Sequence, residues 1–430
     1  MKTIEQKAKK VPAIRFAGFE DEWVEKIFGE SFTYLQNNTL SRAELNSESG
    51  LAKNIHYGDV LVKFGECIDV AEEKIPFVSD AFVVDKFKNS FLQDGDIVIA
   101  DTAEDETVGK CTEMQGVNEA ILLSGLHTIP SRPKEKYGSK FLGYYLNSSA
   151  YHQQLLPLMQ GVKVLSISKS ALQETNLVIP KDNQEQQKIG SFFSNIDSLI
   201  SLEQKKYDKL TQVKKSMLEK MFPKEGATVP EIRFANFTGE WEKKKLGDMG
   251  TTYTGLSGKT KSDFGHGMGR FVTYMNVFLN PVSDPNRTEA VEIDNTRNTV
   301  QHGDVFFTTS SETPEEVGMS SVWLDKTENI YLNSFCFGYR PTENIDPFYL
   351  AYMLRSNVVR KKITYLAQGI SRYNISKNGV MEIEVPLPNF KEQQKIGSYF
   401  SHLDSLISLQ QRKLEKLKNI KKSLLEKMFV

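Results

Sequence analysis

The chain has 430 residues, 39% hydrophobic and 25% charged, which is typical globular composition and enough length for two or three domains. Its formal net charge of −1 argues against a simple basic nucleic-acid binder. The first residues, MKTIEQKAKKVP, contain no apolar core, and no stretch approaches about 18 uncharged apolar residues. We therefore expect a cytoplasmic protein without a signal peptide or membrane span.

Near the N-terminus lies a segment that returns later in the chain. VPAIRFAGFEDEWVEK, residues 11–26, matches VPEIRFANFTGEWEKK, residues 229–244, at 10 of 16 positions. We call these two segments the short repeats. A match of this quality over so short a stretch indicates an internal duplication.

The sequence after each short repeat mixes strand, turn and helix signals. Gly-Asp turns precede apolar or alternating runs in YGDVLVKF (57–64), DGDIVIAD (94–101) and HGDVFFTT (302–309), which indicates strands. Apolar periodicity predicts helices in residues 140–159 and 346–367. These signals predict an α/β or α+β domain of about 150 residues in each half.

A longer repeat closes each half. Residues 185–222 match residues 392–429 at 27 of 38 positions, and we call them the long repeats. Asp182 with Glu185, and Asn389 with Glu392, have the spacing of a reciprocal capping box, which predicts a helix start. Each long repeat is therefore predicted to be one helix.

Apolar residues recur at seven-residue steps in both long repeats, and a polar residue, Glu203 or Gln410, interrupts them at the matching place. This pattern predicts a coiled-coil seam with one polar position in each helix. The two helices most simply pack antiparallel, although two amphipathic helices, each on its own domain, remain the alternative. The predicted seam residues are Ile189, Ile196, Leu210, Met217, Ile396, Leu403, Leu417 and Leu424.

Further matches between the repeats complete the duplication. QGVKVLSISK (160–169) matches QGISRYNISK (368–377), whereas residues 27–92 and 245–299 resist alignment. Two units of about 200 residues are too long for solenoid repeats, so we expect a pseudo-twofold dimer within one chain. Because matching segments surround segments that differ, the two halves should bind two different ligands at a fixed separation. The predicted parts are a first domain (1–182), a central helix (183–224), a second domain (225–389) and a C-terminal helix (390–430).

Charge is distributed unevenly along the chain. Residues 185–224 carry a net charge of +3 and residues 392–430 carry +4, which leaves −8 for the remainder. If the protein binds DNA, its own charge supports weak phosphate binding, and a partner is expected to supply further phosphate contacts.

No catalytic or metal-binding constellation is recognisable in the sequence. TGLSGKT, residues 254–260, resembles a phosphate-binding loop, but two residues between its glycines are too few to wrap a phosphate. The acidic run 101–106 lacks calcium-loop spacing, and the six histidines show no HExxH pairing. The three cysteines lack metal-ligand spacing and are interpreted as buried thiols.

Taken together, the PxIRFxxFxxxW segment, the strand opened by GD, the QG turn followed by ISK, and the duplicated helix from EQQKIG to LEKMF form a pattern that covers nearly the whole chain. It resembles the specificity (S) subunit of Type I restriction-modification systems. The resemblance implies two target recognition domains, one for each half of a bipartite DNA target, spaced by an antiparallel coiled coil.

The resemblance also implies partners and cofactors. Two methyltransferase (M) subunits would bind S-adenosylmethionine and methylate adenine, and restriction (R) subunits would use ATP and Mg to cut DNA, whereas this chain would be non-catalytic and hold no cofactor. The alternative is a cytoplasmic coiled-coil scaffold whose two domains bind proteins.

Candidate DNA-binding residues follow from side-chain chemistry, because Arg and Lys suit guanine edges and phosphates, and Asn and Gln suit adenine. In the first half they are Asn37, Asn38, Arg42, Lys63, Gln160 and Lys163. In the second half they are Lys259, Lys261, Arg270, Tyr274, Asn276, Gln368, Ser371, Arg372 and Tyr373.

Overall fold

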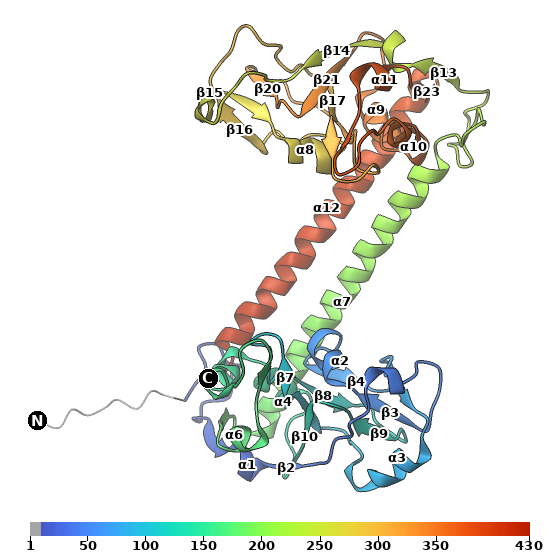
Figure 1. Ribbon diagram of the computed structural model, residues 1–430. Coiled ribbons are helices and arrows are strands. Elements are labelled where there is room, and N and C mark those ends of the chain that lie inside the picture. The colour runs from blue at the N-terminus through green and yellow to red at the C-terminus, as the bar shows by residue number, and fades with distance from the viewer. Residues whose placement is uncertain (1–9) are drawn as a thin grey trace, which may run out of the picture. The chain divides into compact units, whose positions relative to one another are not determined.

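A computed structural model describes residues 10–430 (Figure 1). The chain divides into two compact units: unit 1 contains the residues up to Glu203 together with Lys413–Val430, and unit 2 contains Gln204–Arg412. Each unit combines sheets with short helices, the mixed α/β class predicted from the sequence. The long repeats form two 38-residue helices, α7 (Asn183–Lys220) and α12 (Phe390–Lys427), and each helix contributes one part to each unit.

Unit 1 is built around a five-stranded sheet with the order β2-β10-β6-β8-β4. These strands are β2 (Phe32–Tyr34), β4 (Cys67–Asp69), β6 (Ile97–Ala100), β8 (Cys111–Gln115) and β10 (Thr128–Pro133). The smaller sheets pair β1 (Val24–Ile27) with β12 (Asn176–Ile179), β7 (Thr102–Ala103) with β11 (Leu165–Ser166), and β3 (Ala52–Ile55) with both β5 (Phe77–Val78) and β9 (Leu122–Ser124). The helices are α1 (Phe28–Ser31), α2 (Tyr57–Val62), α3 (Ala81–Lys86), α4 (Phe141–Leu146), α5 (Ser149–His152) and α6 (Lys169–Gln173), with 3-10 turns at Arg42–Glu44, Lys88–Ser90 and Leu156–Leu158.

Unit 2 has a four-stranded sheet with the order β14-β21-β17-β19. These strands are β14 (Gly250–Thr254), β17 (Val305–Thr308), β19 (Ser320–Val322) and β21 (Cys336–Pro341). The smaller sheets pair β13 (Glu242–Lys245) with β23 (Glu384–Leu387), β18 (Ser310–Ser311) with β22 (Tyr373–Asn374), and β15 (Phe264–Val272) with both β16 (Thr288–Val291) and β20 (Ile330–Leu332). The helices are α8 (Tyr274–Leu279), α9 (Pro347–Met353), α10 (Asn357–Tyr365) and α11 (Lys377–Met381), with 3-10 turns at Leu246–Asp248 and Lys261–Asp263.

Two of the three Gly-Asp signals mark strands, as predicted, and the structure shows why the aspartate is needed. Asp96, before β6, accepts 2.9 and 2.7 Å hydrogen bonds from Nε and Nη2 of Arg132. Asp304, before β17, forms the same pair with Arg340 at 2.8 and 2.7 Å. In each unit the pair joins the turn to the neighbouring strand of the central sheet.

The third Gly-Asp signal was misread, because residues 57–62 form helix α2 rather than a strand. His56 caps this helix, since its Nδ1 accepts a 3.2 Å hydrogen bond from the Gly58 amide. Asp59 bonds Arg42 instead of a neighbouring strand. The same dipeptide thus begins a helix where a side-chain cap precedes it.

The predicted helices in 140–159 and 346–367 are each interrupted by a polar side chain that bonds another segment. Asn147 ends α4, because its amide bonds the backbone N–H and C=O of Cys111 in β8. Arg355 stands between α9 and α10 and donates to four carbonyl oxygens, those of Ser320, Val277, Phe278 and Asn280. Tertiary hydrogen bonds therefore override helix continuity at both places.

The short repeats hold the first turns of the long helices. Arg15 donates to both oxygens of Glu185 at 2.6 and 2.8 Å, and Arg233 does the same to Glu392 at 2.7 and 2.8 Å. In the predicted capping boxes, the glutamate side chain would bond back to the amide of the capping residue. This part of the prediction is wrong, because an arginine binds both carboxylate oxygens of each glutamate. The forward half holds at α12, where the Glu392 amide donates to Asn389 Oδ1 at 3.0 Å.

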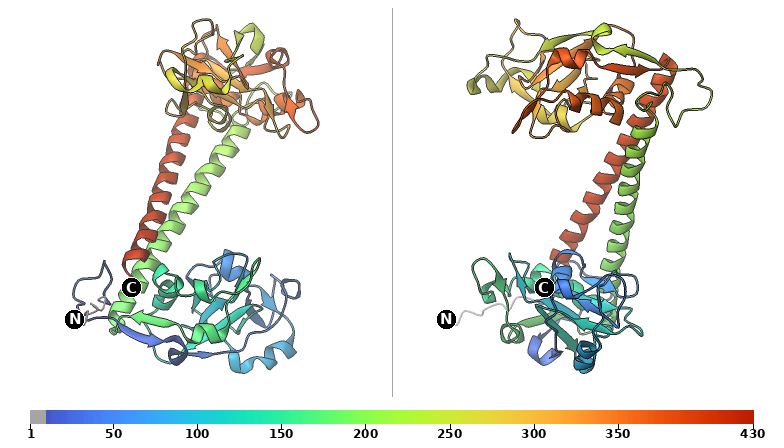
Figure 2. Two further views of the ribbon diagram at one scale, coloured as in Figure 1. Left: turned by 60° about the vertical axis from the view of Figure 1, so that its left-hand side comes forward. Right: turned by 45° about the vertical axis from the view of Figure 1, so that its right-hand side comes forward.

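Aromatic side chains at the ends of the long repeats complete the core of each unit. In unit 1, Phe429 lies among Trp23, Phe141 and Phe193, with ring centroids 6.4, 6.1 and 5.7 Å away. The starting part of α7 and the final part of α12 both contribute to this core, and Figure 2 shows both helices reaching unit 1. The C-terminal residues of the chain are thus part of the unit 1 core.

Phe222 has the equivalent place in unit 2. It is fully buried, with ring centroids 6.4 Å from Trp241, 5.8 Å from Tyr349 and 6.0 Å from Phe400. The final part of α7 and the starting part of α12 therefore close this core as well.

A half-buried lysine joins the two helices to a tyrosine in each unit. In unit 1, Lys421 Nζ lies 2.7 Å from Asp197 and 2.9 Å from Glu66, and the Tyr144 hydroxyl donates to Asp197. Although burial opposes the charge, these carboxylates raise the pKa of Lys421. In unit 2, Lys214 pairs with Asp404 at 2.5 Å, and Asp404 also accepts from a tyrosine, Tyr352.

The predicted seam residues are buried or half-buried. Ile189, Ile196, Ile396 and Leu403 are buried, and Leu210, Met217, Leu417 and Leu424 are half-buried. The sequence missed Leu414, which is also buried. Glu203, the polar interruption in α7, is 4% exposed and bonds Lys413 Nζ at 2.8 Å.

Two further sequence expectations concern membrane spans and the cysteines. Over residues 10–430, the structure contains no helix both long and apolar enough to cross a membrane. Cys111 and Cys336 are buried free thiols, and burial raises the pKa of Cys336 to about 12, whereas Cys67 is half-buried.

We predict that Phe222→Ala destabilises unit 2 by about 3–5 kcal/mol, because it removes a fully buried ring and leaves a cavity. Urea unfolding monitored by tryptophan fluorescence measures this, since Trp241 contacts the ring. Ile420→Ala, which truncates a side chain 41% exposed on α12, is the control and should change stability by less than about 0.5 kcal/mol. A loss below about 1 kcal/mol for Phe222→Ala would refute the role of this ring.

Candidate nucleic-acid interface

Each unit presents a short hairpin built from the QG repeat. In unit 1, Gln160 and Ser166 exchange two backbone hydrogen bonds of 2.9 and 2.8 Å, and in unit 2 Gln368 and Asn374 do the same. Gly161 and Gly369 have φ of +120° and +145°, and a Cβ at either would lie 2.0 Å from a carbonyl oxygen across the loop. Glycine is therefore required in both hairpins.

The hairpin is anchored to the end of a central strand. In unit 1 the Ile167 amide donates to Asp101 O, and the Asp101 amide donates to His127 O. In unit 2, Ile375, Thr309 and Phe335 repeat this ladder. We call the resulting surface the hairpin surface: residues 100–103, 125–128 and 160–166 in unit 1, and 308–311, 333–336 and 368–374 in unit 2.

Aromatic side chains border both hairpin surfaces. Tyr57, at the start of α2, lies 5.3 Å from the ring of His127, and Tyr274, at the start of α8, donates 2.8 Å to Ser310 O. Burial raises the pKa of Tyr274 above its ordinary value. Phe335 is 59% exposed. Tyr57 and Tyr274 are half-buried, and the exposed ring of Phe335 suits stacking or edge contacts with bases.

Several predicted DNA-binding residues gather on these surfaces. Those with exposed side chains are Gln160, Lys163, Gln368, Ser371 and Arg372. Within residues 10–430, no side-chain hydrogen bond or ion pair engages any of these five. Tyr373 is half-buried in β22, where it pairs with Ser311. The polar groups of the five exposed side chains are therefore available to a ligand.

Two predicted residues are corrected by their burial, since Asn38 and Asn276 are each 1% exposed. The Asn38 amide donates to Asn54 Oδ1 at 2.6 Å, and the Asn276 amide donates to the carbonyls of Asp284 and Arg287 at 2.8 and 3.0 Å. Both side chains support loops and offer no surface to DNA.

The other predicted residues in the two halves are mostly engaged by neighbours. Arg42 is bound to Asp59, which raises the pKa of its guanidinium through the side-chain hydrogen bonds, and Lys63 is paired with Glu73 at 3.0 Å. The Asn37 amide donates to Gly125 O at 3.2 Å, beside the turn of the hairpin surface. Asn37 thus borders the surface, whereas the charges of Arg42 and Lys63 are already partnered.

In unit 2 the glycine-rich loop holds its own basic residues. Lys259 pairs with Asp294 at 2.9 Å, and Arg270 donates to Thr288, whereas Lys261 is exposed. TGLSGKT follows strand β14 but leads into a 3-10 turn and strand β15 rather than a helix. The helix N-terminus of a phosphate-binding loop is therefore missing, in agreement with the sequence prediction.

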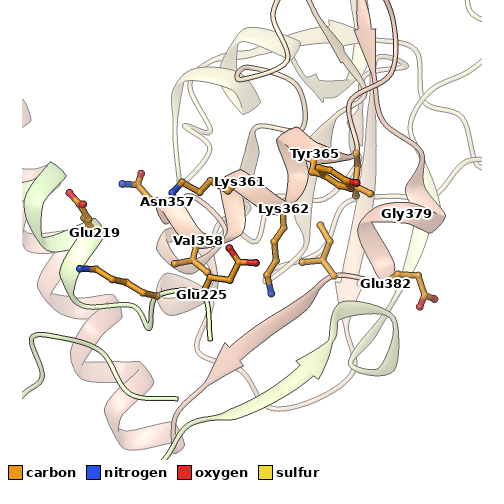
Figure 3. Close-up of a pocket in the computed structure, with 12 residues that line it drawn as sticks. Glu219, Glu225, Asn357, Val358, Lys361, Lys362, Tyr365, Gly379 and Glu382 are labelled. Atoms are coloured by element: carbon orange, nitrogen blue, oxygen red, sulfur yellow. The ribbon is translucent and has the colours of Figure 1, made fainter. Parts of the chain in front are cut away.

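A separate pocket of about 780 Å³ lies in unit 2 between the end of α7 and the helices α10 and α11 (Figure 3). Lysine and glutamate side chains line it together, including Glu219, Lys361 and Lys362. None of the predicted DNA-binding residues is part of its lining. No group of three or more potential metal-ligating side chains is present within residues 10–430.

Sequence alignment missed one correspondence between the halves. Tyr57 and Tyr274 fall in regions that do not align, yet each begins a six-residue helix directly after a strand that pairs in parallel with β9 or β20. The signal available was a capping residue, His56 or Thr273, before each tyrosine.

Comparison with known proteins identifies the family. The family model described as Type I restriction modification DNA specificity domain matches residues 58–212 and 238–419. A putative type I restriction enzyme MjaX specificity subunit from Methanocaldococcus jannaschii is 24% identical over 77% of this chain and 76% of its own length. The chain belongs to the Type I restriction-modification DNA specificity family.

Solved structures show the same fold. An S subunit of a Type I restriction-modification system from M. genitalium superposes with a TM-score of 0.54 at 15% identity, covering 98% of this chain and 99% of that one. A chain from a type I R-M system structure on complex assembly and conformational transition gives 0.54 at 16% identity, covering 95% and 97%. Specificity subunits recognise DNA, and catalysis resides in their partner subunits, so this chain is a non-catalytic recognition subunit.

We predict that Arg372→Ala weakens specific DNA binding of the complex by about 1–3 kcal/mol and affects one half of the target, because an exposed arginine on the hairpin surface suits a guanine edge or phosphate. Binding to duplexes altered in one half at a time measures this. Lys361→Ala removes the same charge from the pocket wall of the same unit and should change binding by less than about 0.5 kcal/mol. Equal weakening by both substitutions would show that only overall charge matters.

Proposed function

We propose that this chain reads a bipartite double-stranded DNA target, with one hairpin surface for each half. The observation that carries the proposal is the recurrence of one anchored hairpin in both units with different side chains after the shared Gln-Gly. Lys163, Val164 and Leu165 in unit 1 correspond to Ser371, Arg372 and Tyr373 in unit 2. A shared frame with different polar groups suits two different short sequences.

We further propose that α7 and α12 form an antiparallel coiled coil and that the chain is a pseudo-twofold dimer. Matching contacts support this: Lys421 with Asp197 corresponds to Lys214 with Asp404. Glu203, held by Lys413 near the middle of α7, would fix the register of the helices. The recognition domains would then be residues 1–182 and 225–389, with the helices setting the distance between the half-sites.

We propose that two M subunits dock on exposed leucines of the two helices. Leu199 and Leu202 are 49% and 48% exposed on α7, and Leu406 and Leu409 are 49% and 60% exposed at the matching positions of α12. An apolar pair repeated once in each unit suits two copies of one partner. R subunits would join the same complex, in the cytoplasm.

We propose that the cofactors bind to the partner subunits rather than to this chain. S-adenosylmethionine would bind the M subunits, and ATP and Mg would bind the R subunits. Because the net charge of this chain is −1, the M subunits would also supply the phosphate contacts needed for tight binding. The protein-binding scaffold alternative is not favoured by membership in a DNA specificity family.

Exchanging residues 27–180 for the corresponding part of a relative with a different target tests the two-reader proposal. We expect the half read by unit 1 to change and the other half to stay, because the hairpin surface of unit 2 is untouched. Mapping of methylated adenines in cells that express the hybrid with its M subunit measures both halves. A change in both halves would mean that the units do not read independently.

The docking proposal predicts that Leu199→Glu together with Leu202→Glu leaves one M subunit bound where the native chain binds two, since burying the new charges is costly. Native mass spectrometry of the complex counts the subunits. Val62→Glu, at a side chain 88% exposed on α2, is the control and should keep both. Retention of two M subunits by the double variant would place the docking site elsewhere.

A further inference from the structure

The tip of each hairpin carries an aliphatic side chain that no protein contact covers. Val162 is 99% exposed in unit 1, and Ile370 is 95% exposed at the matching position in unit 2. Single exposed apolar residues are common on protein surfaces. Here, however, the same kind of side chain stands at the same place in both units, directly after the glycine that shapes the loop.

The hairpin holds this tip in a fixed position. Two backbone hydrogen bonds close each loop. The residue directly after each hairpin is buried: Ile167 is 3% exposed and Ile375 is 8% exposed. β11 pairs with β7 and β22 pairs with β18, so each hairpin is bonded to the end of a central strand. An aliphatic group on a stiff, anchored loop can be pressed against a ligand without losing much conformational freedom.

Comparison of the two hairpins shows some residues that are common to both and some that differ, which suggests two different roles. Gln, Gly and a β-branched aliphatic residue are common to both hairpins, whereas the next three positions differ. Residues that differ suit the reading of different bases. A residue common to both units suits an operation needed at both half-sites whatever their sequence.

We propose that Val162 and Ile370 are positioning residues that wedge against a base step in their half-sites and partly unstack it. This inference rests on the proposed function, because the adenine methylated in each half-site must leave the base stack to reach the M subunit. Aliphatic side chains inserted between base steps are a known way to open and kink a duplex. Burial of the tip against the bases also removes its apolar surface from water.

The surroundings of the tip suit DNA better than a protein partner. Lys163 and Arg372 lie one and two residues beyond the tips, and both are exposed. Gln160 and Gln368 stand two residues before them with exposed amides. Basic and amide groups flanking a small apolar tip match phosphate and base-edge contacts around an inserted side chain.

The test uses the full chain assembled with its M subunits and a duplex that contains both half-sites, with 2-aminopurine one base from one target adenine at a time. Fluorescence should rise when the native complex binds, because the probe becomes unstacked. Val162→Ser should reduce this rise at least about twofold, and slow methylation roughly tenfold, at the half-site of unit 1 alone. Ile370→Ser should do the same at the other half-site.

Val162→Ile and Ile370→Val keep an aliphatic wedge and should preserve both signals. Phe82→Ser, at a side chain 78% exposed on α3, controls for the loss of exposed apolar surface and should change neither signal. All four hairpin variants alter side chains at least 95% exposed, so folding should be unaffected.

Three outcomes would overturn the wedge. Specific binding by the native complex without a rise in fluorescence would reject unstacking and leave the proposed function standing. Serine variants with native fluorescence but slow methylation would show that the tips contact DNA without opening it. Failure of the native complex to bind any specific sequence would overturn the proposed function and the wedge together.

Discussion

Each unit depends on an aromatic side chain delivered by a helix that begins in the other unit. Phe429 follows α12 and fills the core of unit 1, and Phe222 follows α7 and fills the core of unit 2. The long helices are therefore parts of both cores as well as connections between them. Movement of either helix end would disturb the packing around Trp23 in unit 1 or around Trp241 in unit 2.

The hairpins, where we propose that recognition takes place, consist largely of exposed residues. Four strands of each central sheet and the Asp–Arg pair beside them form a frame that recurs in both halves, and unit 1 adds β4 at the edge of its sheet. The hairpins project from that frame through a few backbone hydrogen bonds and carry exposed polar groups. This division lets exposed side chains at the hairpin change without cost to the core.

The sequence predicted the features that depend on repetition and periodicity. The two long helices, the strands after Gly95 and Gly303, and the burial of Ile189 and Ile396 were predictable because local patterns determine them. The helix at Tyr57, the arginine bonded to Glu185 and the burial of Asn38 were missed. The last two depend on partners elsewhere in the sequence, Arg15 and Asn54, which no local pattern reports, whereas the helix at Tyr57 had a local signal in the capping residue His56.

The central claim is that one chain directs methylation to a target made of two separately read halves. Sequencing of methylated adenines in a foreign host that expresses this chain with its M subunit tests it most directly. We predict a single motif of two short specific blocks separated by a fixed number of unread base pairs, with a methylated adenine in each block. A single continuous block, or methylation without any motif, would contradict the account.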